Sequence, residues 1–177
     1  MTYKFLLFDL DHTLLDFDAA EDVALSHLLK EEGVADIQAY KDYYVPMNKA
    51  LWKDLELKKI RKQELVNTRF SKVFSHFGIE KDGVYLAERY QFYLAQQGQV
   101  FSGAMELIDS IIDRSYELYA ATNGITTIQT GRLEQSGIAP ISRKSSFQSN
   151  SIPKNQMQHF MRKLEPESLT LIKIMPL

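Results

Sequence analysis

The sequence predicts an α/β protein in which a long helical segment interrupts a parallel β-sheet. The continuous apolar run Phe5–Phe8 has the length and composition of a strand buried on both faces, and Tyr116–Ala121 is predicted to be a second strand. Polar residues that suit a functional site follow each run directly. Between Asp18 and Gly98 the apolar residues recur only at helical spacing, and no strand pattern is present.

Two carboxylates, Asp9 and Asp11, follow the first apolar run and precede Thr13. Residues two apart on a strand point to the same side, so we expect both acids at the carboxyl end of the strand. Open α/β sheets bind their ligands at that end. Two close carboxylates need a cation or a shared proton, and Mg²⁺ is the hard cation that carboxylates bind. The alternative is an acidic pair that only caps a turn.

Helix signals fill the stretch between the two strands. Asp18 and Glu21 resemble a capping box, and Gly33 ends the helix that they begin. The second helical segment contains Pro46, which predicts a break or a bend. That second segment is predicted over Tyr40–Leu57. Further helices are predicted over Arg61–Phe77, Asp82–Gln97, Met105–Asp113 and Thr126–Ser136.

The DxDxT pattern after an apolar strand resembles the first motif of the haloacid dehalogenase-like (HAD) hydrolase superfamily. This resemblance implies that Asp9 is a nucleophile that forms an aspartyl-phosphate, and that Asp11 is the general acid and base. It also implies a Mg²⁺ site at Asp9 and Asp11, the latter through its main-chain carbonyl. The carboxylate at position 11 is absent from the dehalogenase and P-type ATPase branches, so the pattern is that of a phosphatase.

The second strand is followed by Thr122, Asn123 and Gly124, which resemble the second motif of the same superfamily. The resemblance implies that the Thr122 hydroxyl and the Asn123 N–H hold a phosphate oxygen, as donors at helix N-termini do. The alternative is a helix cap with ordinary Asn-Gly turn chemistry. Arg132, on the helix that follows, is expected to be solvated.

The resemblance also implies a domain organisation. A Rossmann-like core would comprise residues 1–16 and 99–140, and residues 17–98 would form the helical cap of HAD subfamily I. Asn48–Trp52 and Arg69-Phe70 resemble positions in the bacterial pyrimidine 5′-nucleotidase branch, which implies contacts with a nucleobase. The alternative is that Trp52 packs in the core while Lys49 and Arg69 are solvated.

Residues 141–177 do not resemble the corresponding part of the HAD superfamily. They contain six Lys and Arg against two Glu, and no Asp, although the whole chain carries 21 basic and 23 acidic residues. The third motif, a lysine, and the fourth, an acidic strand end, are missing, so the sheet core is predicted to be incomplete at its carboxyl end. The first strand would then keep an unpaired edge.

A frameshift accounts for this departure. If one nucleotide was lost after the Pro140 codon, the codons of 155–162 restrict the original residues to KPDAAFYE, which matches the third motif. We therefore expect residues 141–177 to be a non-native tail, with a possible helix over Gln156–Leu164 and a strand over Ser168–Met175. The alternative is a divergent but genuine carboxyl segment.

Composition narrows the function further. The net charge of −2 argues against a nucleic-acid polymer as partner, and the absence of cysteine excludes disulfides and thiolate metal sites. We expect a cytoplasmic protein with no membrane partner and a small phosphorylated substrate, with a nucleoside 5′-monophosphate as the first choice. A truncated, catalytically impaired relative and a phosphomutase are the alternatives, and the sequence gives no oligomeric state.

Overall fold

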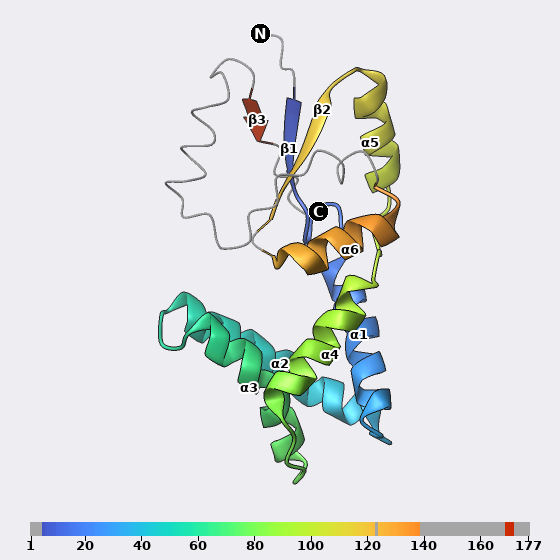
Figure 1. Cartoon of the computed structure of the whole chain (residues 1–177). Coiled ribbons are helices and arrows are strands. Elements are labelled where there is room, and N and C mark those ends of the chain that lie inside the picture. The colour runs from blue at the N-terminus through green and yellow to red at the C-terminus, as the bar shows by residue number, and fades with distance from the viewer. Residues whose placement is uncertain (1–4, 123, 139–168, 172–177) are drawn as a thin grey trace. The chain divides into compact units, whose positions relative to one another are not determined.

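The computed structural model describes residues 5–122, 124–138 and 169–171 (Figure 1). The chain divides into two compact units. The first comprises Met1–Glu21 and Leu94–Leu177, and the second comprises Asp22–Tyr93. Among the described helices, none combines the length and the apolar character that crossing a membrane requires.

The first unit contains a parallel three-stranded sheet in the order β2-β1-β3. Strand β1 (Phe5–Asp9) lies between β2 (Glu117–Ala121) and β3 (Leu169–Leu171), as Figure 1 shows. The register aligns Asp9 with Ala121, so β1 and β2 end at the same edge. The last residue of β1 and the residue that follows β2 are therefore neighbours at the carboxyl edge of the sheet.

The prediction that β1 has an unpaired edge is wrong for the described part of the chain. Strand β3 pairs with it in parallel, from Phe5 opposite Leu169 to Leu7 opposite Leu171. Strand pairing uses main-chain N–H and C=O groups, which any short extended segment supplies, so this edge does not need the family's own strand. The predicted helix over Gln156–Leu164 lies outside the described residues.

Helices α5 (Ala104–Asp113) and α6 (Thr126–Ser136) belong to the same unit. Helix α5 begins after Gly103, whose φ of +82° places it in the left-handed region that glycine tolerates best. The side chains of Ile108 and Leu133 are completely buried. The hydrophobic core of this unit consists of Leu6, Phe8, Leu10, Leu14, Leu15, Ala104, Ile108, Ile111, Leu118, Ala120, Leu133 and Ile138.

Helix α1 (Phe17–Glu31) begins two residues earlier than its predicted cap allows. The Asp16 carboxylate, not that of Asp18, accepts a hydrogen bond from the Ala19 N–H at 3.0 Å. A cap must precede the helix to reach the N–H three residues ahead, and Asp18 already lies within the first turn. There its negative charge interacts favourably with the helix dipole instead.

The second unit is helical and contains α2 (Ile37–Glu56), α3 (Lys62–His76) and most of α4 (Gly83–Ala95). Helix α2 continues through Pro46, so the predicted break does not occur, and the alternative of a bend stays a prediction. Proline removes one hydrogen bond of the helix, but Tyr44 and Asn48 on either side of it are buried and hold the helix in place.

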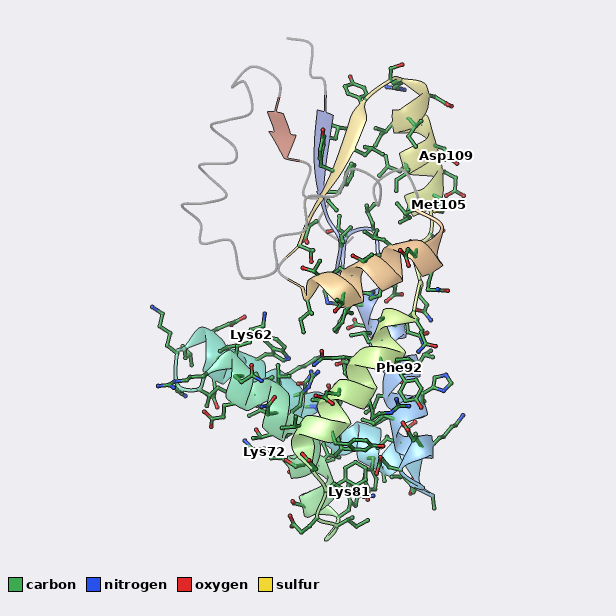
Figure 2. The ribbon with its side chains drawn as sticks, viewed as in Figure 1. Lys62, Lys72, Lys81, Phe92, Met105 and Asp109 are labelled. Carbon is green, nitrogen blue, oxygen red and sulfur yellow. The ribbon has the colours of Figure 1, made fainter. Side chains whose placement is uncertain are left out.

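Aromatic rings form the centre of this helical unit. The ring of Phe70 is stacked on Tyr44 with centroids 5.4 Å apart, and it lies 4.8 Å from the ring of Tyr90. Each of these three side chains is at least 99% buried. Phe92 differs, because it is 53% exposed on α4 (Figure 2). Burial of the three rings makes α2, α3 and α4 one cooperative unit.

Candidate functional site

The site is built on the loop that follows β1. The Leu10 carbonyl accepts hydrogen bonds from the N–H groups of Thr13, Leu14 and Leu15, so the chain turns sharply there. His12 has a φ of +58°, a left-handed conformation that is uncommon for a residue with a side chain. Its N–H donates to the Leu15 carbonyl at 3.0 Å. The completely buried Leu10, Leu14 and Leu15 fix this loop, and with it the Asp11 backbone, to the core.

Asp9 is the last residue of β1, and its side chain is exposed. Its Oδ1 accepts a hydrogen bond from the Leu10 N–H at 2.8 Å. This bond orients the carboxylate at the carboxyl edge of the sheet, the position at which open α/β sheets bind ligands. An exposed carboxylate at that edge is accessible to a substrate or a metal ion.

Asp11 has a different environment, since both of its carboxylate oxygens accept hydrogen bonds from α6. Oδ2 accepts from Gln129 Nε2 at 2.7 Å, and Oδ1 accepts from Arg132 Nη1. The Asp11 side chain is 28% exposed, whereas that of Arg132 is fully buried. The expectation that Arg132 is solvated is therefore wrong: a buried guanidinium needs an anion, and Asp11 supplies it.

Thr122 follows β2 and connects to the same network. Gln129 Nε2 lies 2.9 Å from the Thr122 hydroxyl as well as 2.7 Å from Asp11. The Gly124 N–H donates to the same hydroxyl at 3.0 Å, which is a turn typical of Ser and Thr. The structure thus brings Asp11, Thr122 and Gly124 together, while Asn123 lies outside the described residues.

Gly124 has little room for a side chain. A Cβ atom at this position would lie 2.7 Å from both Cγ and Nε2 of Gln129. The glycine therefore permits the Gln129 amide to reach Thr122 and Asp11.

Sequence reasoning missed Gln129 and misjudged Arg132. The available signal is their position on α6: both are buried, together with Ile128 and Leu133, on the inward face of this helix. Polar residues at helical spacing within an apolar face indicate a buried interaction rather than a solvated surface.

The carboxylates at the carboxyl end of β1 are suitable ligands for a hard cation, but there are fewer of them than a complete Mg²⁺ site requires. Mg²⁺ prefers six oxygen ligands and keeps several waters and substrate oxygens among them. No group of three or more His, Cys, Asp or Glu side chains suited to a metal occurs among the described residues. The Asp9 carboxylate and the Asp11 main-chain carbonyl could therefore supply only some of the oxygen ligands of a Mg²⁺ site.

The helical unit contains the second set of predicted contacts. Trp52 is 38% exposed, so the expectation that it packs in the core is wrong, whereas Lys49 is exposed as expected. Arg69 is buried at 7% exposure, contrary to expectation. Its guanidinium lies over the rings of Phe70 and Tyr90, at 4.6 and 4.8 Å from their centroids, and these rings replace water as its neighbours.

Comparison with known proteins identifies two relatives by sequence. The chain is 84% identical over 140 residues to the pyrimidine 5′-nucleotidase PynA of Streptococcus pneumoniae, an alignment that covers 79% of this chain and 59% of that protein. It is 38% identical over 138 residues to the putative HAD-hydrolase YfnB of Bacillus subtilis, covering 78% of this chain and 58% of that protein. The chain thus spans about three-fifths of the length of the curated relatives that it matches.

The fold comparison agrees with the sequence comparison. The crystal structure of YfnB bound to magnesium superposes with a TM-score of 0.82 at 32% identity, covering 93% of this chain and 74% of that one. No family profile matches the chain.

Proposed function

We propose, since this chain belongs to the haloacid dehalogenase-like (HAD) hydrolase superfamily, that it carries the nucleophile half of a phosphatase site. The observation that supports this proposal most strongly is the bridge made by Gln129. Its amide nitrogen bonds to both the Asp11 carboxylate and the Thr122 hydroxyl, at 2.7 and 2.9 Å. One side chain thereby joins the acid of the first motif to the hydroxyl of the second.

The proposed reaction is hydrolysis of a phosphate monoester in two steps. In the first, an oxygen of Asp9 forms a bond to phosphorus while the bond from phosphorus to the leaving oxygen breaks, and Asp11 gives that oxygen a proton. In the second, Asp11 takes a proton from a water molecule that attacks phosphorus, and the bond to Asp9 breaks. Inorganic phosphate leaves, and both aspartates return to their starting states.

The exposure of the two aspartates suits this division of roles. Asp9 is exposed at the strand end and can approach a phosphorus atom. Asp11 is held on both oxygens by α6 as the carboxylate that accepts a proton from water in the second step, and it passes this proton to the leaving oxygen of the next substrate. The Thr122 hydroxyl and the main-chain N–H of residue 123 would hold a phosphate oxygen, and Gly124, whose N–H donates to that hydroxyl, would shape the turn.

Mg²⁺, held by the Asp9 carboxylate and the Asp11 main-chain carbonyl, would neutralise charge on the phosphate when bound. The magnesium in the YfnB crystal structure supports this assignment.

The proposed substrate is a small phosphorylated metabolite, and specifically a pyrimidine nucleoside 5′-monophosphate. The name of the 84% identical relative supports this choice. The second unit also contains polar side chains in its interior, Asn48 and Arg69, at positions that the sequence singled out for a nucleobase.

An impaired enzyme is the second candidate. The described residues include no cluster of three metal-binding side chains. Loss of the lysine of the third motif and the acids of the fourth would leave the phosphate charge poorly neutralised. We therefore expect the chain to hydrolyse its substrate slowly.

The test is a phosphatase assay of this chain with uridine 5′-monophosphate and p-nitrophenyl phosphate in the presence of Mg²⁺. Single-turnover conditions, with the protein in excess, make slow hydrolysis measurable. Asp9→Asn should abolish product formation, and Asp109→Asn, which changes an exposed acid of α5 (Figure 2), should leave the rate unchanged. Hydrolysis that survives Asp9→Asn would refute the assignment, and phosphate appearing on an added sugar would indicate a phosphomutase.

A further inference from the structure

Arg132 is a buried cation whose hydrogen bonds are only partly satisfied. Its side chain has no exposed surface, and its guanidinium carbon lies 5.5 Å from the ring centroid of Phe17. Nη1 donates to Asp11 and, at 3.3 Å, to Gln129 Oε1. Nε and Nη2 have no hydrogen-bond partner among the described residues.

Such an arrangement contributes little to the stability of the fold. The free energy of removing a guanidinium from water exceeds the free energy gained from one carboxylate partner unless all of the guanidinium N–H groups are hydrogen-bonded. An apolar residue of similar size would fill the same space without unsatisfied donors. The arrangement is better explained by what it does to Asp11, since both oxygens of that carboxylate are held from one helix.

Gln129 completes the arrangement. It is 2% exposed, and its Oε1 accepts from Arg132 while its Nε2 donates to Asp11 and Thr122. Because one end of the amide is held by Arg132, the other end must present Nε2 to Asp11 and Thr122. Arg132 thus fixes the orientation of Gln129 as well as that of Asp11.

We propose that Arg132 and Gln129 are positioning residues that aim the Asp11 carboxyl group for proton transfer to the leaving oxygen. This inference rests on the proposed phosphatase function. The two residues touch neither substrate nor nucleophile in this assignment, and they act through Asp11. Their effect on release of the leaving group should therefore be confined to substrates whose leaving oxygen needs a proton, whereas the later water attack, which also uses Asp11, is common to all substrates.

Leaving groups of different basicity separate this role from a purely structural one. The 5′-alkoxide of a nucleoside is strongly basic and needs a proton as it leaves, whereas p-nitrophenolate leaves readily without one. Misaiming Asp11 should slow release of uridine from uridine 5′-monophosphate far more than release of p-nitrophenol from p-nitrophenyl phosphate. A general loss of structure would slow both equally.

The experiment measures single-turnover rates of uridine and p-nitrophenol release with Arg132→Met, Arg132→Lys and the control Arg114→Met, an exposed arginine of the same unit. Arg132→Met should reduce the nucleotide rate roughly 10²-fold and the aryl phosphate rate less than about 10-fold, with little change in half-saturating concentration. Arg132→Lys should recover part of the nucleotide rate. In an Asp11→Asn background, Arg132→Met should cause no further loss.

Equal losses for the two substrates, or an additive loss in the Asp11→Asn background, would overturn the inference while leaving the phosphatase function intact. Wild-type protein without Asp9-dependent hydrolysis would overturn the proposed function, and the positioning role with it. If Arg132→Met does not fold by circular dichroism, Gln129→Leu takes its place and must show the same difference between substrates.

Discussion

Gln129 and Asp11 are joined by a 2.7 Å hydrogen bond, although they lie 118 positions apart in the chain. The bond connects helix α6 with the loop that follows β1, and the same amide nitrogen reaches Thr122. The relative placement of the two motif loops is therefore set by a side chain that belongs to neither motif. Changes to Gln129 or its neighbours should act on both loops at once.

Gly124→Ala tests this dependence. The added methyl group would meet the Gln129 side chain at 2.7 Å, so the amide must move away from Thr122 and Asp11. We expect a loss of about 1–3 kcal/mol in the free energy of unfolding, measured by urea denaturation. The control is the same substitution in a Gln129→Ala background, where space is available and the loss should be much smaller. Equal losses in the two backgrounds would contradict the close contact.

A second prediction concerns the contribution of the buried Ile108 side chain to the stability of the first unit. Ile108 is completely buried on α5, whereas Ile112 on the same helix is 37% exposed. Ile108→Ala should lower the free energy of unfolding by about 2–5 kcal/mol, because it removes buried methyl groups and leaves a cavity. Ile112→Ala is the matched control and should cost well under half as much. Similar costs for the two variants would show that α5 does not pack as described.

Stability of the helical unit should depend on pH through Glu31. Arg89 donates two hydrogen bonds to this carboxylate, at 2.9 and 3.0 Å, and these bonds lower the pKa of Glu31. A carboxyl group with a lowered pKa stabilises the fold above its unfolded-state pKa, and this contribution disappears as the pH falls through the folded-state pKa. Glu31→Gln should therefore lower the thermal midpoint slightly at neutral pH.

The difference between Glu31→Gln and wild type should shrink as the pH falls below the ordinary range for glutamate, about 4.3. Glu88→Gln, a change at an exposed glutamate of α4, is the control for removing one negative charge from this unit. If the difference in thermal midpoint between Glu31→Gln and wild type grew on acidification, it would contradict a lowered pKa of Glu31.

The frameshift hypothesis predicts a gain of activity on repair. The PynA alignment spans 140 residues, which equals the length of the stretch that precedes the proposed shift. Inserting one nucleotide after the Pro140 codon should restore a lysine that neutralises phosphate charge. We expect at least about 10²-fold faster hydrolysis of uridine 5′-monophosphate than for this chain. A repaired reading frame without the KPDAAFYE run would refute the hypothesis directly.

Much of the fold follows from local patterns in the sequence. The buried residues Leu25, Leu28 and Leu29 mark the inward face of α1, and Gly33 follows the helix that it was expected to end. Periodicity succeeds here because each helix buries one face regardless of its distant neighbours. The two strands were predictable because an apolar run of that length suits a buried strand.

The errors arose where a residue's environment depends on distant partners. Arg132 and Arg69 are charged, and a charged residue on a helix is usually solvated, yet each is buried against groups from another segment. A strand over Ser168–Met175 was predicted and Leu169–Leu171 lies within it, but its pairing with the edge of β1 was not predicted, because that pairing depends on backbone groups. Neither kind of contact can be seen in a local window of sequence.

The most direct test of the account is to trap the phosphoenzyme. The chain is mixed with ³²P-labelled uridine 5′-monophosphate and Mg²⁺, quenched in acid, and digested so that the label can be located by mass spectrometry. The account predicts label on Asp9 and none in Asp9→Asn. Label on any other residue, or equal labelling of Asp9→Asn, would contradict it.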